Sequence, residues 1–172
     1  MITIRKKELK IFLWNFGGRQ GKTNLLYKIC KNMTFENSEG TNGVHVETTN
    51  FNGIKMNFME IGGGYLIKLL RNEHIPNSDA VIFLIDSSHP LDDDSSTENI
   101  KDLQECIKAI EDKPLLIVIT KIDIRKTSTL DIINTYQLND LYERKEKFGI
   151  IECSSYSSQG TKEILFWLSS LK

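Results

Sequence analysis

The sequence predicts a three-layer α/β domain, in which helices cover both faces of a mainly parallel sheet. Short apolar segments alternate along the chain with segments whose apolar residues recur at helical spacing. The apolar segments have the length and near-continuous hydrophobicity of strands that are buried on both faces of a parallel sheet. A glycine-rich turn follows the first apolar segment and precedes a helical pattern, so it lies at the strand end where such folds bind ligands.

Six strands are expected, and five of them are apolar. Residues 44–51 alternate apolar and polar side chains, which predicts a more exposed strand than the others. Because strands joined through helices pair in parallel, most of the sheet should be parallel. The five apolar strands are residues 9–16, 56–61, 80–86, 115–119 and 148–153.

Helices are expected between these strands, where apolar side chains share one face. The first follows the glycine-rich turn and carries Leu25, Leu26 and Ile29. Two further helices are predicted over residues 97–111 and 161–171. The side chain of Ser95 or Ser96 is placed to cap the helix over 97–111.

Length and composition indicate one domain, residues 1–172, with enough apolar side chains (40%) for a single core. The formal charge is −1 and no basic run is present, which argues against direct binding of nucleic acid. The apolar stretches are strand-sized and the N-terminus lacks the apolar core of a signal peptide, so we expect an intracellular, cytoplasmic monomer. Three widely spaced cysteines in apolar segments predict buried thiols.

The glycine-rich turn, residues 16–23, has the sequence F-G-G-R-Q-G-K-T and predicts a phosphate-binding P-loop. Gly21 permits the tight turn, the Lys22 ammonium can reach the β/γ oxygens of a polyphosphate, and the Thr23 hydroxyl can ligate Mg²⁺. Phe16 stands where the first glycine is usual, so either a large side chain ends the strand or Gly17 takes over in a shorter loop. The other residues assigned to nucleotide binding here are Gly17, Gly18, Arg19, Gln20 and Asn24.

A second motif, Thr120-Lys121-Ile122-Asp123, directly follows the strand at 115–119. A carboxylate at Asp123 can accept from the ring N–H and the amino group of guanine, a pair of donors that adenine lacks. The Lys121 stem can cover the base while its amine reaches back towards the P-loop. Residues 153–155, after the last strand, can offer backbone N–H groups to the guanine carbonyl oxygen; they are Cys153, Ser154 and Ser155.

Glu60 followed by three glycines, at the end of the strand over 56–61, is typical of a nucleotide-dependent switch. The Glu60 carboxylate can orient a water on Mg²⁺, and the N–H of Gly63 can contact a γ-phosphate. Thr41, in a glycine-containing turn before the next strand, can add a second hydroxyl to the metal. Thr23 and Thr41, with Glu60 acting through water, would form the protein's share of an octahedral Mg²⁺ site.

These motifs resemble those of the Arf and Arf-like small GTPases. The resemblance is carried by T-N-G-V-H-V-E-T at 41–48, E-I-G-G at 60–63, T-K-I-D at 120–123, C-S-S at 153–155 and L-F-W-L at 165–168. It implies a three-layer Ras-like P-loop GTPase fold with a mainly parallel six-stranded sheet, which binds GTP and GDP with Mg²⁺. It also implies effector, exchange-factor and activating proteins that contact switch regions near 36–50 and 60–75, in vesicle transport, membrane or ciliary traffic.

Carried over residue by residue, the resemblance makes Lys22 and Thr23 the phosphate and metal residues and Thr41 the threonine of switch I. Gly63 becomes the γ-phosphate sensor. Lys121 and Asp123 become the residues that read guanine.

Several positions depart from the family pattern. Glu60 replaces an aspartate, Thr120 replaces the commoner asparagine, and Phe16 replaces the first P-loop glycine. Gly64 occupies the position of the glutamine that orients the attacking water, so no catalytic residue is assigned and intrinsic GTP hydrolysis is expected to be slow.

The termini also depart from the family pattern. Ile2 replaces the acylated glycine, Lys172 ends the chain without a prenylated cysteine, and the amphipathic N-terminal helix of Arf proteins has no counterpart. We therefore expect no direct membrane anchor, with any recruitment to membranes or the cilium made by partners.

Two function classes remain open from the sequence. One is a guanine-nucleotide switch, favoured by Lys22, Thr23 and Asp123. The other is a pseudo-GTPase scaffold that has lost nucleotide turnover, favoured by the departures at Phe16, Glu60 and Gly64. An ATP-dependent P-loop kinase is disfavoured by Asp123 and by the absence of an arginine-rich lid.

Overall fold

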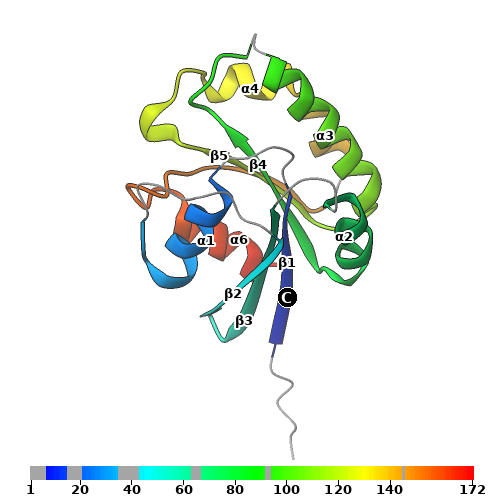
Figure 1. Ribbon diagram of the computed structural model, residues 1–172, viewed down its shortest axis with the longest axis vertical. Coiled ribbons are helices and arrows are strands. Elements are labelled where there is room, and N and C mark those ends of the chain that lie inside the picture. Colours follow the sequence, from blue (N-terminus) through cyan, green and yellow to red (C-terminus); the bar gives the residue numbers. More distant parts are fainter. Residues whose placement is uncertain (1–6, 15–20, 35–42, 63–66, 92–93, 145) are drawn as a thin grey trace, which may run out of the picture.

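Six strands form one sheet in the order β2-β3-β1-β4-β5-β6 in the computed structural model (Figure 1). The structure describes residues 7–14, 21–34, 43–62, 67–91, 94–144 and 146–172. Every neighbouring pair of strands is parallel except β2–β3, which is antiparallel. The strands are β1 Lys7–Trp14, β2 Gly43–Phe51, β3 Ile54–Gly62, β4 Ala80–Asp86, β5 Leu115–Thr120 and β6 Phe148–Glu152.

The mainly parallel, six-stranded sheet predicted from the sequence is therefore confirmed, with small shifts at strand ends. The alternating strand β2 lies at the edge of the sheet, as its half-polar pattern predicts. β1 ends at Trp14 within the described residues, whereas the apolar pattern suggested residue 16. β4 has the predicted bounds, because its seven residues are apolar up to the terminal aspartate.

Helices cover both faces of the sheet (Figure 1). Leu25 and Leu26 of α1 join Ile164, Leu165 and Leu168 of α6 in the core on one face. The core on the other face receives side chains from α3 and α4, with Leu70 of α2 packed against it. The helices are α1 Lys22–Lys31, α2 Ile67–His74, α3 Asp94–Ile110, α4 Thr129–Thr135, α5 Asn139–Arg144 and α6 Thr161–Ser169.

The central strands alternate between these two cores, which is why they read as continuous apolar runs. Val81, Phe83 and Ile85 of β4 face the α3 side, whereas Ile82 and Leu84 face the α1 side. All five are at most 1% exposed. Burial on both faces explains the absence of polar alternation in this strand.

Three short helices were not predicted from the sequence, and one helix cap was predicted at the wrong residues. α2, α4 and α5 have six to eight residues, too few for a clear helical period. α3 begins at Asp94, so Ser95 and Ser96 lie inside the helix, and the predicted cap is wrong. The Ser96 hydroxyl instead donates to the Pro90 carbonyl oxygen at 3.2 Å. A preceding turn, rather than the helix itself, therefore uses this hydroxyl.

The three cysteines are free thiols; Cys106 and Cys153 are buried, as predicted, whereas Cys30 is only partly buried. Burial raises the pKa of Cys30 and of Cys153 to about 12, so neither forms a thiolate readily. None of the helices in the described part of the chain is long and apolar enough to cross a membrane.

Candidate nucleotide-binding site

The carboxyl ends of the parallel strands bring the predicted motifs to one edge of the sheet. Register places Leu13 of β1 beside Glu60 of β3, and Asp86 of β4 beside Thr120 of β5. The segment after β6, which begins at Cys153, is tied to the same edge, because Cys153 N donates to Ile119 O at 2.8 Å. Motifs that are far apart in the sequence thus converge because parallel strands end on the same side.

The phosphate end of the site begins at Gly21, which precedes α1 with φ 87°, in the left-handed region. Glycine reaches this conformation without a Cβ penalty, so the chain can turn directly into the helix. The first turn of α1 contains no acidic residue. Its backbone N–H groups and the positive end of the helix dipole therefore favour an anion at this point.

Lys22 is the first residue of α1 and a mostly desolvated cation. Burial lowers its pKa, and nearby Arg71 lowers it further, while Glu60 and Asp102 act in the opposite direction. A polyphosphate beside the ammonium would favour its charged form. The position and electrostatics of Lys22 therefore suit the role that the P-loop motif predicts.

Glu60 is completely buried, and its Oε1 atom accepts a hydrogen bond from Thr23 Oγ1 at 2.7 Å. The hydroxyl and the carboxylate predicted to serve a metal therefore lie side by side. Both are hard oxygen donors of the kind that Mg²⁺ prefers, so the described part of this site fits the ion. The third predicted metal residue, Thr41, lies outside the described residues.

His45 extends this network and was not predicted as a site residue. It pairs with Glu60 across β2 and β3, where its Nδ1 atom lies 3.0 Å from Glu60 Oε1. Its Nε2 atom lies 3.0 Å from Glu47 Oε1, which also forms an ion pair with Lys31 at 2.7 Å. Burial lowers the pKa of His45, but hydrogen bonds and charges from Glu60 and Glu47 outweigh it and raise the pKa overall.

A second buried network lies beside the phosphate end. Arg71 of α2 and Asp102 of α3 are each 4% exposed and form an ion pair of 3.2 Å between Nη1 and Oδ1. The Arg71 guanidinium also lies over the Trp14 ring, 4.3 Å from its centroid. Since Trp14 ends β1, this cluster connects α2 and α3 to the strand that precedes the P-loop. No local motif marks these three residues in the sequence.

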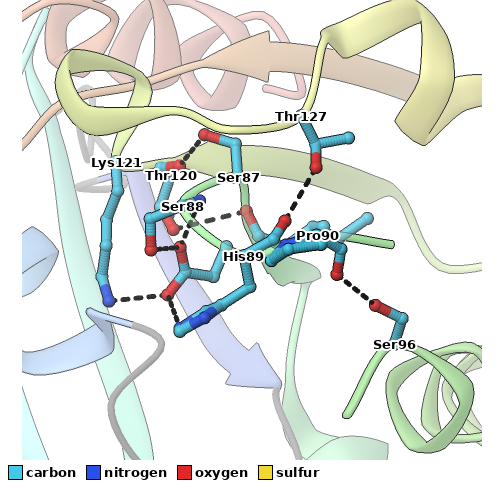
Figure 2. Close-up of polar contacts among 10 residues, drawn as sticks. Ser87, Ser88, His89, Pro90, Ser96, Thr120, Lys121 and Thr127 are labelled. Atoms are coloured by element: carbon cyan, nitrogen blue, oxygen red, sulfur yellow. Dashed lines mark hydrogen bonds and ion pairs between the residues drawn. The ribbon is translucent and has the colours of Figure 1, made fainter. Parts of the chain in front are cut away.

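The base end of the site is organised around Asp86 and Lys121 (Figure 2). Lys121 Nζ lies 2.6 Å from Asp86 Oδ2, and Lys121 has left-handed backbone dihedrals (φ 57°). The Lys121 stem passes Gly21, since a Cβ added to Gly21 would lie 4.0 Å from Lys121 Cε. The stem thus passes the end of the P-loop, while the amine, which was predicted to reach back towards the P-loop, pairs with Asp86, an aspartate that sequence reasoning missed.

Short hydrogen bonds fix the backbone around this pair (Figure 2). Ser88 donates to Asp86 Oδ1 from its backbone N at 2.8 Å and from its hydroxyl at 2.6 Å. The Ser87 hydroxyl donates to Thr120 O at 2.7 Å, and the Thr120 hydroxyl donates to Ile85 O at 3.3 Å. Thr120 is therefore buried and joins two neighbouring strands through hydrogen bonds, a structural role that a threonine hydroxyl can fill.

A cavity of about 300 Å³ lies between the phosphate end and the base end. It joins three separately predicted motifs: the end of the P-loop, the T-K-x-D segment and the loop after β6. Asp123 lies on its wall, in a 3₁₀ turn over Ile122–Ile124, with its side chain exposed. The cavity is lined by Gly21, Asn24, Thr34, Thr120, Lys121, Asp123, Ser155 and Tyr156.

The loop after β6 only partly matches its predicted role. The backbone N–H of Cys153 donates to Ile119 O, and that of Ser154 donates to Gln159 O at 3.0 Å. Both of these predicted donors are therefore already engaged within the protein. Of the three residues, Ser155 lines the cavity.

The remaining predicted site residues lie outside the described part of the chain. They include most of the P-loop and the positions expected to sense the γ-phosphate and to orient water. These residues are Phe16, Gly17, Gly18, Arg19, Gln20, Thr41, Gly63 and Gly64.

Comparison with known proteins identifies the family. The model of the ADP-ribosylation factor family matches residues 1–171, nearly the whole chain. The chain belongs to the Arf family. Two relatives from Dictyostelium discoideum are ADP-ribosylation factor J, which is 30% identical over 168 residues, and ADP-ribosylation factor K, which is 29% identical over 168 residues. In both cases the match covers 96% of this chain and 86% of the relative.

Membership of the Arf family confirms the resemblance drawn from the motifs and agrees with the Ras-like sheet. It supports a small GTPase switch, since Arf-family GTPases bind GTP and GDP and interact with effectors, exchange factors and activating proteins. The base end of the site keeps the residue types of the motif, apart from Thr120. The phosphate end combines them with His45, Arg71 and Trp14.

Proposed function

We propose that this Arf-family protein is a guanine-nucleotide switch that binds GTP and GDP with Mg²⁺ and hydrolyses GTP slowly. The observation that carries the proposal is the cavity bounded by both Gly21 and Asp123. A nucleotide there has its phosphates at the start of α1 and its base at the T-K-x-D segment, in the order that the chemistry requires.

Each described residue of the candidate site has a defined role in this proposal. The Lys22 ammonium binds the β/γ oxygens, and Thr23 and Glu60 hold Mg²⁺, Glu60 through water. The bound ion supplies positive charge that offsets the phosphates. The Asp123 carboxylate accepts from the guanine edge, while the Lys121 stem, held by Asp86, packs against the base.

We further propose that the switch regions near 36–50 and 60–75 contact effectors, exchange factors and activating proteins in membrane traffic, including ciliary traffic. We assign recruitment to membranes to these partners. Flotation of the purified protein with neutral or anionic liposomes, in either nucleotide state, would contradict this part of the proposal.

One observation favours the alternative of a pseudo-GTPase scaffold. His45 lies 3.0 Å from the same Glu60 oxygen that accepts from Thr23, so protein groups already contact this oxygen from two sides. A protein that needs no metal ion to offset the charge of Glu60 can keep its fold without hydrolysing GTP. The nucleotide content of the purified protein, together with its single-turnover hydrolysis of GTP, distinguishes the two functions.

The test uses the purified full chain. We expect guanine nucleotide to be released on denaturation and identified by chromatography, and GTP to displace labelled GDP far better than ATP does. Asp123→Asn should weaken GDP binding roughly tenfold to hundredfold, because charge-assisted hydrogen bonds are lost.

Asp112→Asn is the matched control, since Asp112 is exposed in the turn before β5. An empty site that ignores added GDP, or equal competition by ATP and GTP, would overturn the guanine-nucleotide assignment.

A further inference from the structure

Among the described residues, one aromatic side chain lines the cavity, and neither the P-loop nor the T-K-x-D motif accounts for it. Tyr156 lines the cavity, while the other lining residues are glycine, hydroxyl, amide, carboxylate or lysine side chains. A purine presents polar edges and two π faces. Asp123 can accept hydrogen bonds from one edge of the base. The two faces are removed from water only when they pack against an apolar or aromatic surface.

Tyr156 is also unusually exposed for a large aromatic residue. It is 73% exposed, more than any other large hydrophobic side chain in the described part of the chain. Aromatic side chains commonly line small-molecule sites. The ring therefore has surface available for a base.

The backbone around Tyr156 is held by several contacts, so the ring is presented from a defined loop. Ser154 N donates to Gln159 O at 3.0 Å, and Ser157 N donates to Ser154 Oγ at 3.1 Å. The loop ends at Gly160, with φ 80°, where an added Cβ would lie 1.9 Å from Glu152 O. This close approach folds the loop back onto β6 and leaves Tyr156 on its outer side.

Thr34 connects this loop to α1 on the other side of the cavity. Its hydroxyl donates to Ser155 O at 3.3 Å, and Lys28 Nζ donates to the same hydroxyl at 3.3 Å. The cavity wall at Ser155 and Tyr156 is therefore joined to the helix that begins at the phosphate end. A ligand that fills the cavity contacts both segments at once.

We propose that Tyr156 is a base-stacking residue of the nucleotide site, with its ring packed against a face of the bound purine. This assignment rests on the proposed function. Stacking on an aromatic ring tolerates any base, since every base has a π face. Tyr156 thus contributes to affinity and residence time, while Asp123 selects guanine.

The experiment measures dissociation of tritiated GDP by filter binding from the full-length protein and its variants, which avoids a fluorophore near the ring. Tyr156→Ala should speed GDP release on the order of tenfold, as expected for the loss of one stacked base. The ratio of GTP to ATP affinity should stay unchanged. Tyr156→Phe should release GDP like the wild type, because the ring is retained.

Tyr142→Ala is the matched control. Tyr142 is 55% exposed on α5 and packs against Phe148, with ring centroids 4.8 Å apart and no place in the cavity lining. It should leave GDP release unchanged. Inorganic pyrophosphate lacks a base, so its ability to compete for the site should be the same in the wild type and Tyr156→Ala.

The outcomes separate the two proposals. Unchanged GDP release in Tyr156→Ala, while the wild type binds guanine nucleotide, would overturn the stacking assignment alone. Equal losses in Tyr156→Phe and Tyr156→Ala would overturn it as well, since the hydroxyl would then be the active group. A wild type that binds no guanine nucleotide would overturn the proposed function and the stacking assignment together.

Discussion

The two ends of the candidate site are built differently. At the base end, the predicted residues Thr120, Lys121 and Asp123 lie within four consecutive positions, and contacts with the end of β4 hold Thr120 and Lys121. At the phosphate end, the predicted residues come from separate elements, since Glu60 of β3 accepts a hydrogen bond from Thr23 of α1. The predicted base-reading residues therefore form one short segment, whereas the predicted metal residues meet only through the tertiary structure.

The two ends also differ in the charged pairs that surround them. The base end keeps a motif that is readable in the sequence, apart from the threonine at position 120. Near Lys22, the phosphate end places a buried glutamate paired with the partly exposed His45, and a buried arginine–aspartate pair. Variants that separate the two ends test this difference directly.

The strongest effect should be on stability at the phosphate end. Arg71→Met removes the partner of the buried Asp102 and should lower the free energy of unfolding by about 3–5 kcal/mol, measured by urea denaturation. The cost is large because a buried carboxylate loses its countercharge. Replacing both residues, as in Arg71→Met with Asp102→Leu, should recover most of this loss.

Arg125→Met is the matched control for that variant. Arg125 forms a 3.0 Å ion pair with Glu152 in which the side chains are 35% and 37% exposed. Its loss should cost less than about 1 kcal/mol, because solvent screens the pair. Equal destabilisation by Arg71→Met and Arg125→Met would show that the buried pair has no special role.

The next effect concerns nucleotide affinity. Lys22→Ala should weaken GDP binding by roughly 100-fold or more, because it removes charge-assisted hydrogen bonds to phosphate in a desolvated position. Equilibrium competition with labelled GDP measures the change. Lys108→Ala, on the exposed side of α3, serves as the control. Unchanged affinity in Lys22→Ala would place the polyphosphate elsewhere.

A smaller effect is expected from pH. The pKa of His45 is raised above its ordinary value of 6.5, so its contribution to stability is fully present below pH 6.5 and is lost as the pH rises through the folded-state pKa. The His45 side chain is 23% exposed, so solvent screens part of this contribution, which we expect to be about 1 kcal/mol or less. His45→Asn should therefore reduce the stability of the nucleotide-free protein more at pH 6 than at pH 8.

Denaturation curves at both pH values check this prediction, with His89→Asn at the base end as the control. The His89 side chain is 58% exposed and lies 3.7 Å from Asp86. If His45→Asn lowered the stability equally at both pH values, the contribution of His45 would not come from its charge interaction with Glu60.

The weakest effect is expected on turnover. Small GTPases that keep the catalytic glutamine hydrolyse GTP alone at about 10⁻⁴ s⁻¹, and Gly64 has no side chain to orient water. Single-turnover hydrolysis should be at or below this rate, and Gly64→Gln should give little rescue unless Phe16 leaves the P-loop undisturbed. Much faster hydrolysis by the wild type would mean that another residue positions the water.

Local patterns were sufficient for much of the architecture. The strands could be predicted because burial on both faces leaves continuous apolar runs, as in β4 and β5. The P-loop and the T-K-x-D segment could be predicted because the residues that define each motif lie within a few consecutive positions. The short helices α2, α4 and α5 could not, because six to eight residues hold too few turns to show a period.

The fold class, the family resemblance and the residue types expected to contact phosphate and guanine could all be predicted from the sequence alone. The side chains that support them emerge from the folded arrangement: Asp86 for Lys121, His45 for Glu60, and Trp14 with Asp102 for Arg71. These partners come from different strands and helices, so strand register and helix packing, rather than spacing along the chain, bring their atoms within reach. For the same reason Tyr156 was not predicted, since it becomes part of the cavity wall only when the loop after β6 folds beside α1.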